Sequence, residues 1–270
     1  MTSNLLDDRL EDILETVLET TDDLLVVNPS RETIESFVDV AVAFDGELPD
    51  VRLLAEERPL KDVMDDFLVA SNAADLIEDG VLTLRTGETP SNSLLLTEDD
   101  VIALVDAGTR VGGLTADETE FVDAAKRTYE DRWENADEYT LRTPPISRVR
   151  ESLSADISPE AEADFSNILD SLETARGDGD GLDEVTISLL VAAKNEALLY
   201  DISKWGEDVG IASKATFSRT KTKLEDMGLI DTEKVPIDVG RPRLRLKLGD
   251  ERLQGADNGQ LASVAQSILN

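Results

Sequence analysis

Residues 210–248 read GIASKATFSRTKTKLEDMGLIDTEKVPIDVGRPRLRLKL. A turn at Gly210 precedes an amphipathic helix that ends at Met227. Two segments of alternating polarity follow, Leu229–Lys234 and Arg243–Leu248, and they suit a β-hairpin with a long loop. This order of turn, helix and hairpin is typical of a winged helix-turn-helix.

Two further apolar helices are predicted before this stretch, at Val185–Ala193 and Leu198–Trp205. Residues 184–254 therefore predict a complete winged helix-turn-helix domain, whose third helix is expected to enter the DNA major groove. A tail helix is predicted within residues 255–270.

Charge is distributed unevenly along the chain. Residues 1–183 hold 14 Lys or Arg against 46 Asp or Glu, whereas residues 213–247 hold 9 against 5. Because DNA phosphates attract cations, the basic segment predicts contact with double-stranded DNA, and a merely solvated face is the alternative. The candidate DNA-binding residues are Lys204, Ser213, Lys214, Thr216, Ser218, Arg219, Lys221, Thr222, Lys223, Arg241, Arg243 and Arg245.

The loop between the two strands carries a weak motif of its own. Gly240-Arg241-Pro242 is similar to the core of an AT-hook, in which arginine enters a narrow minor groove. The alternative is a turn whose arginines touch only phosphate.

The N-terminal half alternates between strands and helices. Apolar runs at Leu24–Val27, Val51–Ala55 and Val81–Leu84 are separated by helical segments at Arg31–Phe44 and Pro59–Ile77. This alternation favours an α/β domain with a mainly parallel sheet, over residues 1–140.

The end of this α/β domain carries two further expectations. A hairpin is predicted from Ser93–Leu96 and Val101–Val105. Thr115 and Glu118 are expected to form a capping box for a helix through Trp133.

Residues 141–183 read as a helical linker, because Pro144-Pro145 breaks the chain before another helix that starts near Pro159. The linker ends in Gly177-Asp178-Gly179-Asp180-Gly181, which lacks the spacing of a calcium-binding EF-hand loop and is interpreted as a flexible acidic segment.

Composition excludes several classes of protein. The chain of 270 residues has neither cysteine nor histidine, which removes disulfides, thiolate metal sites and Ser-His triads. Its net charge of −33 is typical of adaptation to a salty cytoplasm, because the Debye length at 1 M salt is only about 3 Å. No apolar run is long enough for a membrane span, and the N-terminus is unlike a signal peptide, so a cytoplasmic protein is expected.

The ends of the three predicted strands carry polar and basic residues that suit a small anionic effector. Ligands of parallel sheets bind beyond the carboxyl ends of the strands, and Ser30 stands at a helix N-terminus, which attracts anions. The more specific interpretation is that these residues bind a sugar phosphate. The alternative is that the basic residues only neutralise acidic neighbours. The candidate effector-binding residues are Asn28, Ser30, Arg31, Arg58, Lys61, Arg85, Thr86, Gly87, Thr89, Ser91 and Asn92.

An enzyme is the less favoured class. Gly108–Thr115 approaches a Walker A phosphate loop, but Leu114 stands where the lysine belongs. A sugar-phosphate or nucleotide hydrolase in the α/β domain remains an alternative, as does a domain that serves dimerisation alone. No cofactor or metal is predicted.

The order of domains and the acidic composition resemble the haloarchaeal TbsP family of transcription regulators. The most specific segment is Ala212–Leu224, ASKATFSRTKTKL, and the resemblance covers nearly the whole chain. It implies control of genes of central carbon metabolism.

A homodimer is expected, because a single winged helix reads few bases. The candidate interface helices are Ala161–Ala175, with the apolar stripe Phe165, Ile168, Leu169 and Leu172, and Leu261–Leu269. The alternative is that these stripes pack within one chain.

Overall fold

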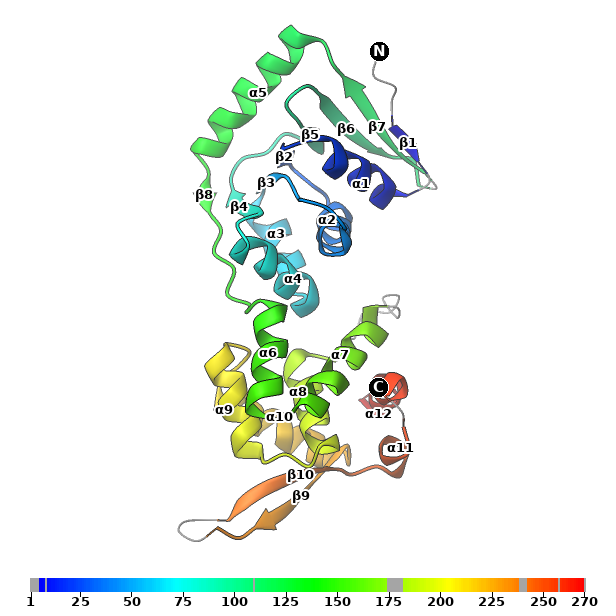
Figure 1. Cartoon of the computed structure of the whole chain (residues 1–270), viewed down its shortest axis with the longest axis vertical. Helices are drawn as coiled ribbons and strands as arrows, with labels where there is room; N and C mark the ends of the chain where they lie inside the picture. Colours follow the sequence, from blue (N-terminus) through cyan, green and yellow to red (C-terminus); the bar gives the residue numbers. More distant parts are fainter. Residues whose placement is uncertain are drawn as a thin grey trace. The chain divides into compact units, whose positions relative to one another are not determined.

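The computed structural model of the chain describes residues 5–7, 9–108, 110–173, 182–237, 242–256 and 258–269. The chain divides into two compact units, residues 1–145 and 146–270. The predicted architecture is confirmed: an α/β region comes first, and a helix-turn-helix with a small antiparallel hairpin follows (Figure 1).

The described part of the first unit holds one eight-stranded sheet, in the order β1-β7-β6-β5-β2-β3-β4-β8. Its strands are β1 (Leu5–Asp7), β2 (Asp23–Val27), β3 (Asp50–Ala55), β4 (Leu82–Thr86), β5 (Leu94–Leu96), β6 (Val101–Asp106), β7 (Val111–Ala116) and β8 (Asp137–Glu138). Its helices are α1 (Leu10–Thr20), α2 (Arg31–Ala43), α3 (Glu57–Met64), α4 (Phe67–Glu78) and α5 (Thr119–Glu134).

The centre of the sheet follows the predicted alternation. Strands β2, β3 and β4 are parallel neighbours, with Val26 opposite Leu53 and Leu53 opposite Leu84. Helix α2 connects the first pair, and α3 with α4 connects the second. The predicted single helix from Pro59 to Ile77 is therefore two helices, because Asp66 caps a new one by accepting hydrogen bonds from the amides of Leu68 and Val69.

The outer strands make the complete sheet mixed. Strands β5, β6, β7 and β1 extend it antiparallel on one side and β8 extends it antiparallel on the other. The predicted β5–β6 hairpin is confirmed. The expected capping box is wrong, because Thr115 lies in β7 and Glu118 itself caps α5, its carboxylate accepting from the Phe121 amide at 2.9 Å.

Both faces of the central strands are covered, which explains their continuous apolar runs. Along β2, Leu24 and Val26 face a core that includes residues of α1, α2, α3 and α4. Leu25 and Val27 face a second core, which Trp133 and other residues of α5 close.

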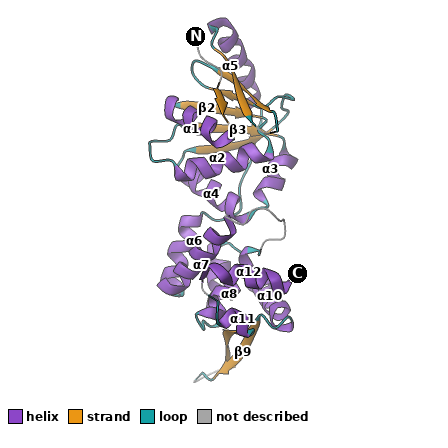
Figure 2. Ribbon diagram, turned by 90° about the vertical axis from the view of Figure 1, so that its right-hand side faces the viewer, coloured by secondary structure: helices purple, strands orange, loops and turns teal. Residues whose placement is uncertain are grey.

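The second unit contains the predicted winged helix-turn-helix and two helices before it. Its helices are α6 (Ile146–Asp156), α7 (Pro159–Glu173), α8 (Glu184–Lys194), α9 (Leu199–Val209), α10 (Lys214–Asp226), α11 (Glu251–Gln254) and α12 (Asn258–Leu269). Its strands are β9 (Ile230–Val235) and β10 (Arg243–Leu248), which form a hairpin that projects from the helices (Figure 2).

The segments predicted as a linker and as dimer interfaces are part of the packing of this unit. Trp205 on α9 donates a hydrogen bond of 2.9 Å to the Ser152 hydroxyl on α6. Phe165 and Ile168 on α7 and Leu261 on α12 are fully buried within the chain. The predicted interface on these two apolar stripes is therefore wrong, because α7 and α12 pack against each other within one chain. None of the helices described is long and apolar enough to cross a bilayer.

Candidate nucleic-acid interface

The turn between α9 and α10 is built by residues with specific geometric roles. Gly210 ends α9 in the left-handed region, with φ of +99°, where glycine is favoured. Ser213 caps α10 by accepting a hydrogen bond of 3.2 Å from the Thr216 amide. A Cβ at Gly206 would overlap the ring of buried Phe217, so glycine permits the close approach of the two helices.

The outward face of α10 carries cations and hydroxyls. Ser218, Arg219, Thr222 and Lys223 are all exposed, and their spacing places them on neighbouring turns of the helix. The Arg219 guanidinium donates to the Thr216 hydroxyl at 3.3 Å, and no carboxylate of the described residues pairs with it. Such a face can contact base edges and phosphates.

The wing is fixed to the helices at several points. The Leu246 amide of β10 donates to the Ala197 carbonyl at 2.9 Å, and Leu198 forms a β-bridge with Arg245. On the other strand, the Thr232 hydroxyl donates to Glu225 of α10 at 2.7 Å. Residues 238–241 lie outside the described residues, and with them the predicted roles of Gly240 and Arg241.

Lys221 is the candidate whose position argues against DNA contact. It is only 9% exposed, and its ammonium lies 2.8 Å from a carboxylate oxygen of Glu225. Hydrogen bonds from Lys221 and then Thr232 lower the pKa of Glu225. Lys221 therefore points inward and links α10 to the wing through Glu225.

Several exposed cations of this region are paired with carboxylates. Lys204 pairs with Asp208 at 2.5 Å within α9, and Lys247 pairs with Glu233 at 2.7 Å across the wing. Their hydrogen bonds raise the pKa of each lysine and lower that of each carboxyl.

Two more cations are held at α9. The Lys214 ammonium lies 2.5 Å from Glu207, and this hydrogen bond raises the pKa of Lys214 and lowers that of Glu207. Arg243 lies 3.4 Å from Asp201, with its guanidinium 4.5 Å from the centre of the Tyr200 ring. The sequence prediction missed Tyr200, although an exposed aromatic residue at the start of a helix was a usable signal.

The predicted effector residues are only partly brought together. The Thr89 hydroxyl donates to the Asn28 side-chain oxygen at 2.9 Å, which joins the loops after β4 and β2. Asn28 has a positive φ of 50°, and Ser30 caps α2 by accepting from the Thr33 amide. Ser91 and Asn92 are exposed farther along the loop after β4.

The predicted cations do not form one phosphate clamp. Arg31 pairs with Glu35 at 2.8 Å, Arg58 is almost fully exposed 4.0 Å from Asp62, and Lys61 is exposed. Arg85 is instead turned toward α5.

Arg85 has a structural position. Its guanidinium donates to the Trp133 carbonyl at 2.8 Å, lies 4.9 Å from the centre of the indole ring and is 4.0 Å from Glu138. Thr86 ends β4, and the backbone of Gly87 lies against Ala136, whose Cβ would be 3.2 Å from a Cβ at this position. The predicted role of Arg85 in phosphate binding is therefore replaced by one in fastening α5 and β8 to the sheet.

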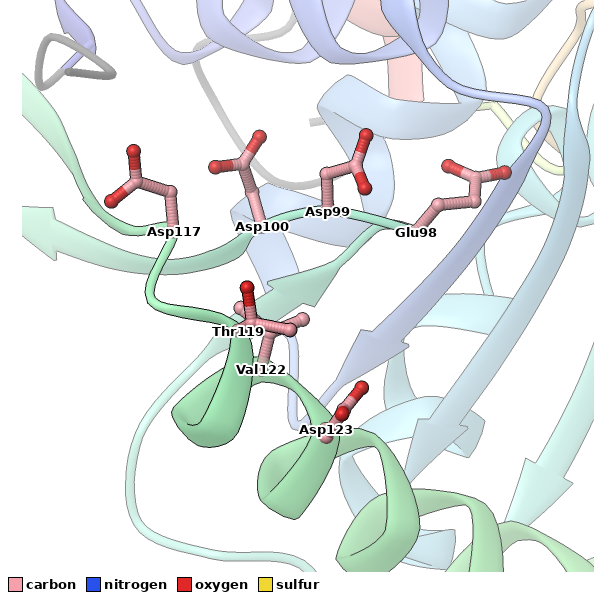
Figure 3. A pocket seen from close by; sticks show the side chains of 7 residues that line it. All are labelled: Glu98, Asp99, Asp100, Asp117, Thr119, Val122 and Asp123. Carbon is pink, nitrogen blue, oxygen red and sulfur yellow. The ribbon is translucent and has the colours of Figure 1, made fainter.

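A pocket of about 440 Å³ lies at the opposite end of the parallel strands, beside the β5–β6 turn (Figure 3). Its lining residues are Glu98, Asp99, Asp100, Asp117, Thr119, Val122 and Asp123. Burial, followed by the charges of Asp117 and Asp99, raises the pKa of Asp100. An anionic effector does not fit this acidic lining.

The segment Gly108–Thr115, which approaches a phosphate loop in sequence, has a different structure. Gly108 lies in a turn with φ of +84°, and residues 111–116 form β7 rather than the start of a helix. A phosphate loop requires a helix N-terminus after its glycines, so this segment is not one. Residues 177–181 of the acidic linker lie outside the described residues, and no cluster of carboxylates suited to a metal occurs in the part of the chain that is described.

Comparison with known proteins identifies the family of both halves. Residues 2–144 match the N-terminal domain of TbsP-like transcriptional regulators, and residues 145–266 match the C-terminal helix-turn-helix domain of the same regulators. The comparison with curated proteins gives no match. One similar solved structure is that of TrmBL2, an archaeal chromatin protein described as showing a novel mode of DNA binding.

The likeness to TrmBL2 is distant, at 12% sequence identity with a TM-score of 0.35. It covers 51% of this chain and 53% of TrmBL2, so the chain spans about half the length of that protein. The two domain matches together cover nearly the whole sequence, and they fall in the regulator class rather than an enzyme class. This chain belongs to the family of TbsP-like transcriptional regulators.

Proposed function

We propose that this chain regulates transcription by binding double-stranded promoter DNA through α10 and the β9–β10 wing. The observation that carries the proposal is the outward face of α10, where Arg219 and Lys223 stand exposed without a carboxylate partner among the described residues. Arginine on a recognition helix reads guanine by two parallel hydrogen bonds, and the neighbouring hydroxyls suit phosphate or base edges.

The wing supplies a second contact region. Arg243 and Arg245 are both partly exposed on β10, and the hairpin is held against α10 and the segment before α9 by the hydrogen bonds from Thr232 and Leu246. A wing in this position would lie along the DNA backbone while α10 occupies the major groove.

Fluorescence anisotropy with a duplex that the wild-type protein has selected from a random pool tests this proposal. Arg219→Ala should lower affinity by roughly 1–3 kcal/mol if Arg219 reads a base. Arg252→Ala is the matched control, because Arg252 lies on α11 and pairs with Asp250. Unchanged affinity in Arg219→Ala together with Lys223→Ala would overturn the proposal.

We further propose that residues 1–140, within the first unit, sense a small anionic metabolite such as a sugar phosphate. This would suit a cytoplasmic regulator of central carbon metabolism in a haloarchaeon, as the resemblance implies. The joined loops of Asn28 and Thr89, beside the N-terminus of α2 with Ser30 and Arg31, support an anion site there. The proposed site leaves out Arg85, because its guanidinium donates to the Trp133 carbonyl.

A thermal-shift screen of sugar phosphates in molar potassium chloride tests the sensor. A ligand that binds the folded state raises the melting temperature by mass action, and Arg31→Ala should lose that response. Arg127→Ala, which removes an exposed arginine from α5, should keep it. An absent shift across the panel would leave the unit as a ligand-independent dimerisation module.

The homodimer also remains a proposal, now without α7 and α12 as its contact helices. A symmetric dimer would double the length of DNA that is read. Light scattering in molar salt that gives the mass of two chains, 29.5 kDa each, would support it, whereas the mass of one chain would contradict it.

A further inference from the structure

Helix α9 carries three carboxylates, and each holds a cation: one on α10, one on the wing and one on α9 itself. Asp201 lies 3.4 Å from Arg243, Glu207 lies 2.5 Å from Lys214, and Asp208 lies 2.5 Å from Lys204. All three pairs are close to half exposed, so solvent and a DNA backbone could reach both members. The cations in these pairs are ones that the sequence predicts as DNA contacts.

The pair of Asp201 and Arg243 has the most defined geometry. The Arg243 guanidinium lies over the ring of Tyr200, which is 49% exposed, at 4.5 Å from its centre. A stacked guanidinium keeps its position when a neighbouring carboxylate is neutralised, because the attraction of the ring face remains. Removal of the Asp201 charge would therefore leave Arg243 in place and free to accept a new anion.

We propose that Asp201 and Asp208 are built-in competitors of DNA phosphate for Arg243 and Lys204, so that they lower DNA affinity rather than support it. A carboxylate and a phosphate bind guanidinium and ammonium groups through the same charge-assisted hydrogen bonds. Exposed ion pairs are weak, so DNA can displace the carboxylates. Each displaced carboxylate then lies beside a phosphate and repels it.

The competition has a consequence for salt dependence. A cation that already holds a carboxylate brings no net charge to the DNA, so fewer counterions are released on binding. Wild-type DNA binding should accordingly weaken less with salt than the number of cations in the interface predicts. This surface would suit a protein that must bind DNA in concentrated salt.

Glu207 is left out of the test because it has a second role. Its other carboxylate oxygen accepts a hydrogen bond of 3.3 Å from the Lys214 backbone amide at the start of α10. A change at Glu207 would alter the turn between α9 and α10 as well as the charge.

The test uses a double variant of the full chain that carries both Asp201→Asn and Asp208→Asn. Asp170→Asn is its control. Asp170 is an exposed residue of α7 in the same unit, so Asp170→Asn removes one carboxylate charge away from the proposed surface, where the double variant removes two. Anisotropy with a short mixed-sequence duplex is measured over the range of salt in which circular dichroism shows each protein folded. Wild type and Arg219→Ala are measured alongside.

The double variant should bind roughly three- to tenfold more tightly than wild type at the lowest of these salt concentrations. The gain should shrink as salt rises, because screening weakens the repulsion between carboxylate and phosphate. Asp170→Asn should bind as wild type does.

Equal or weaker binding by a folded double variant would overturn the inference. A gain in binding free energy in Asp170→Asn that is half as large as that of the double variant would also overturn it, because one removed charge would then act as strongly anywhere on the unit. The inference rests on the proposed function, and the two fail differently. Loss of binding in Arg219→Ala without a gain in the double variant would overturn the inference alone. Absence of DNA binding in wild type and in every variant would overturn the proposed function and the inference with it.

Discussion

The ammonium of Lys221 lies 2.8 Å from Oε2 of Glu225, and Oε1 of Glu225 accepts a hydrogen bond of 2.7 Å from Thr232. This chain of contacts links α10 to β9. The orientation of the wing relative to the recognition helix therefore depends on a lysine that faces the protein rather than DNA.

Glu225→Gln should destabilise the second unit by about 1–3 kcal/mol, because it leaves the ammonium of Lys221 without its counter-charge. Lys221→Met should cost less, since an apolar side chain of similar length can replace a poorly solvated ion. Urea unfolding in molar salt measures both. Strong loss of DNA affinity in Lys221→Met, with stability unchanged, would show that Lys221 contacts DNA after all.

The same pair predicts how stability changes with pH. The folded-state pKa of Glu225 is lowered, so its contribution is present above the unfolded pKa and is lost as pH falls through the folded pKa. The difference in unfolding free energy between wild type and Glu225→Gln should therefore shrink in acid. A difference that stays constant down to acid unfolding would contradict this assignment.

Gly206→Ala should destabilise the helix-turn-helix by about 1–3 kcal/mol, because the added Cβ would overlap the Phe217 ring. An alanine at Gly249 would test a different contact, because the nearest atoms to its Cβ would belong to the backbone of Gly228 rather than to a side chain of α9 or α10. Thermal unfolding followed by circular dichroism is the measurement. Wild-type stability in Gly206→Ala would show that the Phe217 ring does not lie against Gly206.

Arg85→Ala should loosen α5 from the sheet, because the hydrogen bond to the Trp133 carbonyl and the contact with its ring are lost. The expected result is a red shift of tryptophan fluorescence, measured in a Trp205→Phe background so that Trp133 alone reports. An unshifted spectrum, combined with a lost response to sugar phosphates, would restore Arg85 to the effector site.

Asp100→Asn should stabilise the first unit by up to about 1 kcal/mol at neutral pH, because burial and the nearby carboxylates of Asp117 and Asp99 disfavour its charge. Because the pKa of Asp100 is raised in the folded state, the destabilisation by its charge is absent below the unfolded pKa. It grows as pH rises from the unfolded pKa to the folded pKa. Melting temperatures at low and high pH measure it. Destabilisation by Asp100→Asn would indicate that the carboxylate has a partner.

The sequence predicts most of the fold because its signals are local. The central strands are buried on both faces and read as continuous apolar runs, and the sequence of wing strand β10, RLRLKL, alternates between basic and apolar residues. Strand β7 is not predicted from the sequence, because Gly112 and Gly113 interrupt its apolar pattern. Strands β1 and β8 are not predicted because they are too short to show periodicity.

The site is less predictable because side-chain direction depends on neighbours far along the chain. Lys221 follows Phe217 by four residues and precedes Leu224 by three, so its buried position was readable from helical spacing. The contact of Arg85 with Trp133 joins β4 to a helix that begins more than thirty residues later, and no local pattern indicates it.

The proposed function requires that α10 reads DNA through Arg219. Its most direct test compares the affinity of wild type, Arg219→Lys and Arg219→Ala for the selected duplex and for a scrambled one. Because lysine keeps the charge and loses the two-pronged hydrogen bonding of arginine, Arg219→Lys should nearly retain binding to scrambled DNA and lose roughly 1–3 kcal/mol on the selected duplex. Equal affinities of all three proteins for both duplexes would show that Arg219 does not read DNA.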